Sequence, residues 1–174
     1  MADFNLYFPT LLKLEGGLVN DPLDKGGLTK YGITLKEWIR AGYDKDGDGK
    51  IGPSDLKAIT PEDAKPFYKK NYWDLVSGDK IDSQSIAEFI CDWGVNSGTI
   101  TAIKKMQEVI KIASDGIIGT NTLKLLNTGD KQFIFNNLKS RREQFYRNIV
   151  NANPSQEKFL EGWLARNNSF KFKG

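Results

Sequence analysis

The sequence predicts a mainly α-helical protein with one irregular, glycine-rich region near its front. Apolar residues recur at helical spacing along most of the chain, and caps and breakers divide it into helix-sized segments. Few positions favour strands, and no internal repeat or low-complexity linker is visible. The chain has 174 residues, of which 39% are hydrophobic, so it can build one sizeable core or one domain with a small appendage.

The first helix is expected over residues 3–15, where Gly16-Gly17 ends it. Residues 18–33 are broken by NDP and KGG, which predicts a loop or a small hairpin. Thr60 and Pro61 form a strong helix start, and Pro66 is expected to bend the early turns of that helix. The later helices are expected over these segments: 34–41, 54–59, 60–73, 83–95, 100–112, 120–126, 131–151 and 155–167.

Composition excludes several kinds of chemistry. The chain has no histidine, which removes Ser-His-Asp and Cys-His catalysis and the usual histidine-rich zinc sites. The single cysteine, Cys91, precludes an internal disulfide, and its place in the apolar run IAEFICDWGV favours a buried thiol over a nucleophile. Catalysis is therefore expected to come from carboxylates, hydroxyls or a bound ion.

The charge pattern gives a weak indication of a partner. The net charge is +3, and the Lys and Arg residues are concentrated after residue 100, which would suit nucleic acid or an acidic cell-wall polymer. Solvated helix faces explain the same charges more simply. No run of about 18 apolar residues occurs, so no membrane insertion is expected.

Glu15 interrupts the apolar face of the first helix at its end. It lies on the same stripe as Leu11 and Leu12, so its side chain is expected to point toward the apolar side. Partial burial and the negative end of the helix dipole both favour a protonated carboxyl group, which a general acid requires. Asp24 and the Thr29 hydroxyl could hold a water on the far side of a scissile bond. A helix-end acid paired with a lysine, and an ordinary turn aspartate, explain the spacing equally well.

The segment DKDGDGKIGPSD predicts a calcium site. Asp44, Asp46, Asp48 and Asp55 occupy the first, third, fifth and twelfth positions of an EF-hand-like loop, with the Lys50 carbonyl at the seventh. Four carboxylates in so short a segment would repel one another unless a cation neutralised them, which a solvated turn does not explain. Because an aspartate replaces the usual final glutamate, its reach to the ion is shorter. The expected role of Ca²⁺ is structural and not catalytic.

Five motifs together resemble glycoside hydrolase family 108 over nearly the whole chain: EGGLVNDPLDKGGLTKYGIT, YWD, FICDWGVNSG, DGIIGTNT and EKFLEGWLARN. Its members are bacterial and phage N-acetylmuramidases, some of which are described as secretion activator proteins. The resemblance implies a lysozyme-like catalytic domain over residues 1–97, with the EF-hand-like loop as an insertion. It implies a peptidoglycan-binding-like helical segment over residues 98–174, packed into one globule with the first domain.

The resemblance also implies site residues and a reaction. The glutamate of the family's EGG motif is the catalytic acid, and it matches Glu15. The order Glu, Asp, Thr is similar to that of phage-type lysozymes, which implies Asp24 and Thr29 as the water-positioning pair, although their spacing is one residue shorter here. The implied reaction is hydrolysis of the β-1,4 bond between N-acetylmuramic acid and N-acetylglucosamine. Inversion is expected, and retention through a covalent intermediate is the alternative.

Other positions resemble ligand-binding parts of the family. Tyr31, Trp93 and Asn96 resemble positions near the sugar cleft, although a tryptophan on an apolar helix is more often a core residue. Asp115-Gly116 and Gly119 to Thr122 resemble the wall-binding segment, and a plain turn before a capped helix explains them about as well.

The resemblance implies peptidoglycan as the partner of an endolysin-like enzyme from a phage, prophage or wall-remodelling system. A monomer is expected, although no sequence feature indicates the oligomeric state. The N-terminus lacks a basic region followed by an apolar stretch, so the protein is expected to be made in the bacterial cytoplasm without a signal peptide. It would act in the periplasm or cell wall after holin-type or other release. The alternative function is a non-catalytic, calcium-dependent protein that holds peptidoglycan with its basic C-terminal half. Nucleic-acid binding is not expected.

Overall fold

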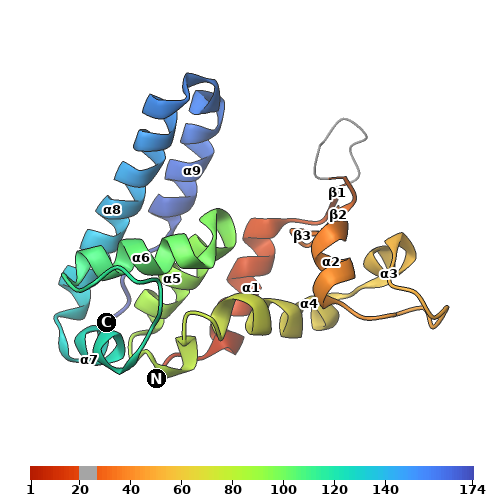
Figure 1. Cartoon of the computed structure of the whole chain (residues 1–174), viewed down its shortest axis with the longest axis horizontal. Helices are drawn as coiled ribbons and strands as arrows, with labels where there is room; N and C mark the ends of the chain where they lie inside the picture. Colours follow the sequence, from red (N-terminus) through yellow and green to blue (C-terminus); the bar gives the residue numbers. More distant parts are fainter. Residues whose placement is uncertain (20–26) are drawn as a thin grey trace. The chain divides into compact units, whose positions relative to one another are not determined.

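The computed structural model describes residues 1–19 and 27–174. These residues form nine α-helices and one small antiparallel sheet (Figure 1), which confirms the prediction of a mainly α-helical fold. None of their helices is both long and apolar enough to cross a membrane. The chain divides into two compact units: Asn5–Asn71 forms one, and Met1–Phe4 together with Tyr72–Gly174 forms the other. The predicted division after residue 97, into a catalytic domain and a peptidoglycan-binding segment, concerns function and not compactness. It stays a prediction.

The Asn5–Asn71 unit contains the glycine-rich region. Its sheet has the order β1-β2-β3, in which Leu18 pairs with Lys30, and Lys30 pairs with Ile33. The predicted small hairpin after the first helix is therefore present among the described residues. The elements that lie wholly or mostly in this unit are α1 (Phe4–Glu15), β1 (Leu18–Val19), β2 (Thr29–Lys30), β3 (Ile33–Thr34), α2 (Leu35–Ala41), α3 (Pro53–Ala58), α4 (Pro61–Tyr68) and the π-helical turn η1 (Lys69–Trp73).

The helix predicted over residues 60–73 has two parts. It begins as expected, with Thr60 as its cap and Pro61 in its first turn, and α4 remains α-helical through Pro66 to Tyr68. The backbone then widens into η1, which ends at the buried Trp73. At the junction the Lys69 N–H is shared between the carbonyls of Lys65 and Pro66, so the chain stays helical from α4 into η1.

The unit formed by Met1–Phe4 and Tyr72–Gly174 is built around α5. Every residue of α5 from Ser85 to Gly94 is buried except Glu88, and α5 contacts α6 and α8. The thiol of Cys91 is buried there, as predicted, and burial raises its pKa well above the usual value. The elements are the 3-10 turn η2 (Gly78–Lys80), α5 (Gln84–Ser97), α6 (Thr99–Val109), α7 (Thr120–Thr128), α8 (Lys131–Ala152), the 3-10 turn η3 (Pro154–Gln156) and α9 (Glu157–Ser169).

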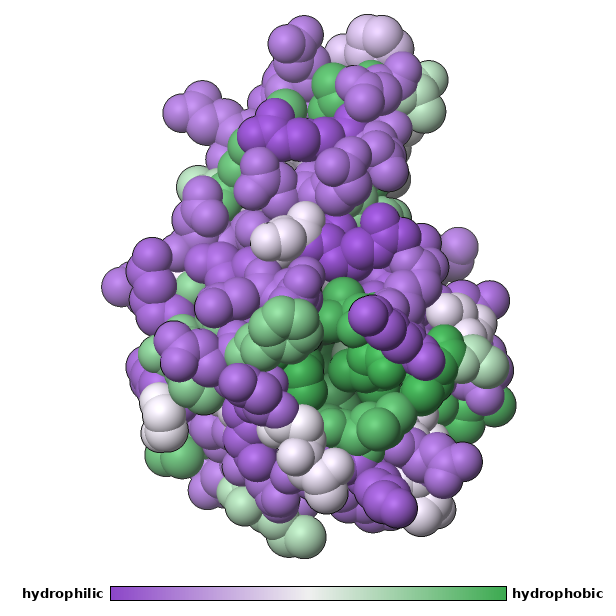
Figure 2. All heavy atoms as spheres, turned by 90° about the vertical axis from the view of Figure 1, so that its left-hand side faces the viewer, coloured by the Kyte–Doolittle hydropathy of each residue, from purple (hydrophilic) through white to green (hydrophobic). Residues whose placement is uncertain are grey.

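Helices α8 and α9 lie side by side as a hairpin joined by η3 (Figure 1). Apolar side chains gather around a hollow on the face that carries α6, α7 and the start of α8 (Figure 2). Exposed apolar residues of these elements and of the segment before α7 are Ile100, Ile117, Leu125 and Phe133. Such a cluster on the surface of one unit marks a place where a ligand or partner can bind.

Candidate active site

Glu15 is the last residue of α1, and it is half-buried. Leu11, one turn earlier on the same face, is completely buried. The helix ends there because Gly16 adopts a left-handed conformation, with φ of 75°, and its N–H donates to the Leu12 carbonyl at 3.1 Å. The sequence thus places a carboxyl group where an apolar helix face ends, partly shielded from water.

The tip of the β2–β3 hairpin is the second part of the site. Because Lys30 pairs with Ile33, Tyr31 and Gly32 form a two-residue turn between the strands. Both have positive φ, 51° and 76°, as the type I′ turn that suits a twisted hairpin requires. A non-glycine residue in this conformation is uncommon, and it persists where surrounding contacts hold it in place.

Gly32 brings the Glu15 carboxyl group and the Tyr68 hydroxyl together. A Cβ atom on Gly32 would lie 2.5 Å from Glu15 Oε2 and 2.7 Å from the Tyr68 hydroxyl oxygen, so both atoms border one backbone position. Tyr68, from α4, is 1% exposed, and its hydroxyl donates a hydrogen bond of 2.7 Å to the Tyr31 carbonyl. The buried tyrosine therefore fixes the turn that lies against the candidate acid.

Sequence reasoning missed Tyr68 and Gly32. The tyrosine lies in the helical segment PFYKK, where an aromatic residue has the pattern of a core residue, and no spacing relates it to Glu15. The glycine of KYGIT carried a usable signal, because a two-residue turn between strands favours glycine. Its contact with Glu15 follows only from the three-dimensional arrangement.

The predicted water-positioning pair is described only in part. Thr29 lies on β2, is half-buried, and its hydroxyl donates to the Gly27 carbonyl at 3.3 Å. Asp24 lies outside the described residues. The structure thus places Thr29 on the strand that leads into the turn beside Glu15, and the role of the pair stays a prediction.

The predicted sugar contacts occupy different environments. Tyr31 is half-buried at the hairpin turn, with the Lys30 ammonium 5.6 Å from its ring centre. Trp93 is completely buried on α5, between the rings of Phe89 and Phe145, so its ring offers no face to a ligand in this structure. Trp93 is therefore a core residue, which is one of the two alternatives that the sequence left open. Asn96 is half-buried near the end of α5 and lines a pocket.

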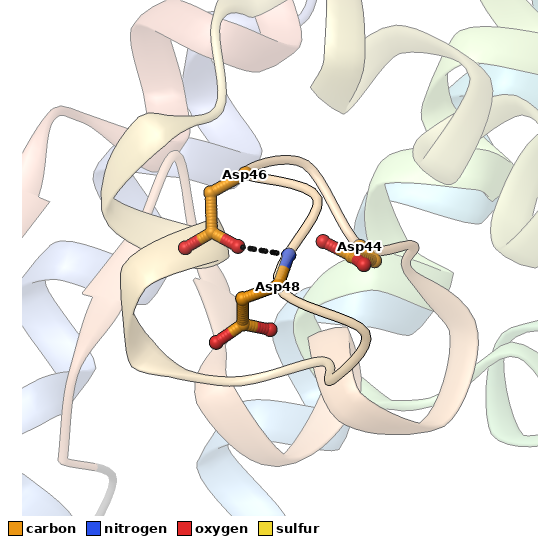
Figure 3. Close-up of side chains that lie close together, drawn as sticks. All are labelled: Asp44, Asp46 and Asp48. Carbon is orange, nitrogen blue, oxygen red and sulfur yellow. Dashed lines mark hydrogen bonds between the residues drawn. The ribbon is translucent and has the colours of Figure 1, made fainter.

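The acidic loop brings three of its predicted ligands together. Oxygen atoms of Asp44, Asp46 and Asp48 lie within 4.8 Å of one another, and the three side chains lie close together on the loop (Figure 3). Calcium binds oxygen at roughly 2.3–2.6 Å, so a group of this width can surround the ion. The Lys50 N–H donates to Asp48 Oδ1 at 2.8 Å, which continues the curl of the loop.

Asp55 is not part of that group. It is completely buried, and its Oδ1 accepts the Lys45 and Asp46 N–H groups while its Oδ2 accepts the Gly52 N–H. These backbone hydrogen bonds, above all that from Gly52, lower the pKa of Asp55. The residues thus fit Ca²⁺ as a three-carboxylate site, and Asp55 closes the loop against the start of α3.

A separate pocket lies beside the predicted wall-binding segment. It has a volume of about 480 Å³ and lies between the end of α6, residues 112–119 and the start of α7. Gln107 shapes it: its side-chain N–H groups donate to Asp115 Oδ1 and the Ile117 carbonyl, and its carbonyl accepts the Gly116 N–H. The hydrogen bonds from Gln107 and the Ile117 N–H lower the pKa of Asp115.

Comparison with known proteins decides the family. Residues 8–98, more than half of the chain, match the family model described as Glycosyl hydrolase 108. The chain belongs to the glycosyl hydrolase 108 family. Residues 101–168 match a second model, described as Predicted Peptidoglycan domain. The family resemblance in the sequence is therefore confirmed, and this family member is a peptidoglycan-acting glycoside hydrolase.

A solved structure agrees with this assignment. The structure titled "Structure of Brucella abortus SagA" is similar with a TM-score of 0.72 and 27% sequence identity, over 96% of this chain and 94% of that chain. No curated protein matches. The mainly helical, lysozyme-like fold expected from the resemblance is thereby confirmed for this member of the glycosyl hydrolase 108 family.

Proposed function

We propose that the protein is an N-acetylmuramidase that hydrolyses the β-1,4 bond between N-acetylmuramic acid and N-acetylglucosamine, with Glu15 as general acid. The observation that supports this most is the half-buried Glu15 carboxyl group beside Gly32 and the Tyr68 hydroxyl. A positioned carboxylic acid can protonate the leaving oxygen of a glycosidic bond. Membership of the glycosyl hydrolase 108 family supports the same class of reaction.

The second half of the reaction would use Asp24 and Thr29. In the proposed mechanism these residues hold a water on the face of the sugar opposite Glu15, and attack of that water inverts the anomeric carbon. Thr29 lies on β2, whose hairpin turn borders Glu15, which supports its place at the same site. Proton NMR of freshly cleaved oligosaccharide distinguishes the outcomes, since inversion releases the α-anomer first and retention the β-anomer.

The identity of the cleaved bond has a direct test. Purified peptidoglycan is digested, the new reducing ends are reduced with borohydride, and the products are identified by mass spectrometry. A muramidase leaves muramic acid at the reduced end, which is the expected result. Glucosamine at the reduced end would show a glucosaminidase and overturn the proposed bond specificity without changing the reaction class.

We also propose that the loop from Asp44 to Asp55 holds a structural Ca²⁺ ion through Asp44, Asp46 and Asp48. The width of this carboxylate group supports the proposal. The Lys50 carbonyl is the predicted backbone ligand, and Asp55 supports the loop from behind through the backbone N–H groups it accepts. Bound Ca²⁺ would neutralise the clustered charge and stabilise the folded loop, while the chemistry stays with Glu15.

A further inference from the structure

A small pocket lies in the Tyr72–Gly174 part of the chain, where the end of α5 meets the facing sides of α8 and α9. Its volume is about 190 Å³, below the roughly 300 Å³ of ordinary small-molecule sites, so it suits one substituent better than a whole ligand. Among the described residues that line it, none is charged. They are Asn96, Ser97, Phe145, Tyr146, Ile149 and Trp163.

A buried ionic cluster lies behind this pocket. Asp92 on α5 and Arg142 on α8 are both completely buried, and Arg142 Nη1 lies 2.8 Å from Asp92 Oδ2, at an angle outside hydrogen-bond geometry. Arg166 on α9 donates to the same carboxylate from Nη2 at 2.8 Å and from Nε. One carboxylate thus ties the three helices together. Removing it would leave buried positive charge without a partner, which is strongly destabilising.

The cluster extends to the pocket wall through Tyr146. Arg142 Nε donates to the Tyr146 oxygen at 2.8 Å, and the Tyr146 hydroxyl donates in turn to Asn96 Oδ1 at 2.5 Å. Because a guanidinium group can only donate, the tyrosine hydrogen must go to another acceptor. The Asn96 atom that faces Tyr146 is therefore its carbonyl oxygen, and the network fixes which way the amide points.

The Asn96 amide nitrogen is left available by this arrangement. The Ser97 hydroxyl also donates to Asn96 Oδ1, at 3.0 Å, so two hydroxyl groups occupy the oxygen. None of the hydrogen bonds found among residues 1–19 and 27–174 uses the two N–H groups of Asn96. A half-buried pair of donors, on an amide oriented by the buried Tyr146 and lining a pocket, suits a ligand carbonyl.

The rest of the wall is apolar. The rings of Tyr146 and Trp163 stack with centres 5.2 Å apart and planes at 22°, and Phe145 packs at 5.7 Å against Tyr146. Ile149 completes this side. Such a pocket accommodates an uncharged ligand group that has a carbonyl acceptor next to a small apolar part. The acetamido group, which both sugars of peptidoglycan carry, has this composition.

We propose that this pocket binds the acetamido group of an N-acetylhexosamine in the glycan strand. Asn96 donates from its amide nitrogen to the acetamido carbonyl, and the wall formed by Phe145, Ile149 and Trp163 receives the methyl group. Asn96 is thus a specificity-determining residue, and Tyr146 positions it. The inference rests on the proposed function, since it assigns one contact to the glycan on which the enzyme would act.

The test uses the full chain carrying Glu15→Gln, which prevents hydrolysis, and two probes: the tetramer of N-acetylglucosamine and the same tetramer without its acetyl groups. Affinity is measured by NMR titration of the ¹⁵N-labelled protein. The Asn96 side-chain NH₂ signal and the Trp163 indole N–H signal report on the pocket. We expect both to shift with the acetylated tetramer and to change little with the deacetylated one.

Asn96→Asp removes the two donors and keeps the size of the side chain. We expect it to weaken binding of the acetylated tetramer about tenfold, the effect of one lost hydrogen bond to a neutral partner. Asn148→Asp, an identical change at an exposed position of the same helix as Tyr146, is the matched control and should bind as tightly as its parent. Unchanged thermal midpoints in both variants show that folding is intact.

Three results would overturn the inference: equal affinity of Asn96→Asp and its parent, equal affinity for the two tetramers, or acetylated binding without a shift of the Trp163 signal. Each is separable from failure of the proposed function, which is measured as cleavage of peptidoglycan by the wild type. If the wild type cleaves peptidoglycan and the NMR signals of the pocket do not shift, only this inference fails. If the wild type does not cleave peptidoglycan and the protein does not bind the tetramer, both the proposed function and this inference fail.

Discussion

Gly32 is the residue on which the position of Glu15 depends. Its left-handed backbone forms half of the hairpin turn, and the space that a Cβ would occupy is taken by the Glu15 carboxyl group and the Tyr68 hydroxyl. Two requirements therefore meet at one position, a positive φ and the absence of a side chain. The observed positions of the Glu15 carboxyl group and the Tyr68 hydroxyl therefore both require glycine at this position.

Gly32→Ala should lower the rate of peptidoglycan cleavage roughly ten- to hundredfold, because the new methyl group displaces the Glu15 carboxyl group from its working position. The rate is measured on purified peptidoglycan at equal concentrations of folded protein. With chelator present, so that no ion occupies the loop, Gly47→Ala gives the cost of left-handed strain in the free energy of unfolding, since Gly47 has φ of 80° with open space around it. Full activity of Gly32→Ala would mean that Glu15 does not need its observed position.

Single residues also show where sequence analysis ends. The sequence marked Glu15 as a candidate because a carboxylate interrupts an apolar helix stripe there, and the family resemblance of the EGG motif favoured a catalytic acid over an ordinary helix-end acid. Tyr68 lies far along the chain on α4, and only the packing of α4 against the hairpin turn relates it to Glu15. Trp93 shows the reverse case, since its motif resembles a sugar-site position and its ring is buried among other aromatic rings.

The acidic loop between α2 and α3 is the element whose conformation depends most on its own carboxylates. Asp44 accepts the Gly47 and Gly49 N–H groups and thereby closes the first turn of the loop. The order of aspartates and glycines was visible in the sequence, as was the expected clustering of the carboxylates. The burial of Asp55 was not visible in the sequence, because it depends on backbone N–H groups that converge only when the loop has folded.

Calcium should raise the thermal unfolding midpoint of the chelator-treated wild type by several degrees, since an ion that binds only the folded loop stabilises it by mass action. Asp46→Asn combined with Asp48→Asn should abolish this shift, because two of the three clustered carboxylates lose their charge. Asp82→Asn, an exposed aspartate outside the loop, should keep it. A midpoint that is the same with calcium and with chelator would contradict the calcium site.

The start of α4 is a second element held by a carboxylate. Asp63 accepts hydrogen bonds from the Thr60 N–H at 2.7 Å, from the Thr60 hydroxyl and from the Tyr43 hydroxyl, and it pairs with Lys45 at 2.7 Å. Burial would raise the pKa of Asp63, but the hydrogen bonds from Lys45, Tyr43 and Thr60 outweigh it and hold that pKa well below its usual range. The same bonds raise the pKa of Tyr43 and Lys45.

The low pKa of Asp63 makes stability depend on pH. Near and below about pH 4, where an unfolded aspartate takes up a proton, the unfolded chain binds more protons than the folded one, so stability rises with pH. The contribution of Asp63 is present above that range and is lost as the pH falls toward the folded pKa. Asp63→Asn should therefore flatten the fall in unfolding free energy between pH 5 and pH 3, measured by urea unfolding with chelator present.

Glu62→Gln changes the neighbouring exposed acid in the same way and is the matched control for that titration. A pH dependence of Asp63→Asn as steep as that of the wild type would contradict the role assigned to the α4 network. At neutral pH Asp63→Asn should also be less stable than the wild type, because Tyr43 and Lys45 lose the charged acceptor that they share.

For the whole molecule, the sequence predicted helix content and helix order well because each helix carries its own periodicity, caps and breakers. The division into compact units at Asn71 and Tyr72 was not visible, since the boundary falls within the continuous helical turn η1 and no linker composition marks it. The buried cluster of Asp92, Arg142 and Arg166 was also hidden, because its members lie on three helices far apart in the chain.

If Glu15 is the general acid of a peptidoglycan-cleaving enzyme, its substitution must remove cleavage and leave binding intact. Wild type and Glu15→Gln, at equal folding, are incubated with purified peptidoglycan, and both bound protein and new reducing ends are measured. We expect the variant to bind as the wild type does but to lose cleavage by about two orders of magnitude or more. Comparable cleavage by the variant, or binding without cleavage by the wild type with and without Ca²⁺, would contradict it, and the second result would favour a non-catalytic peptidoglycan-binding protein.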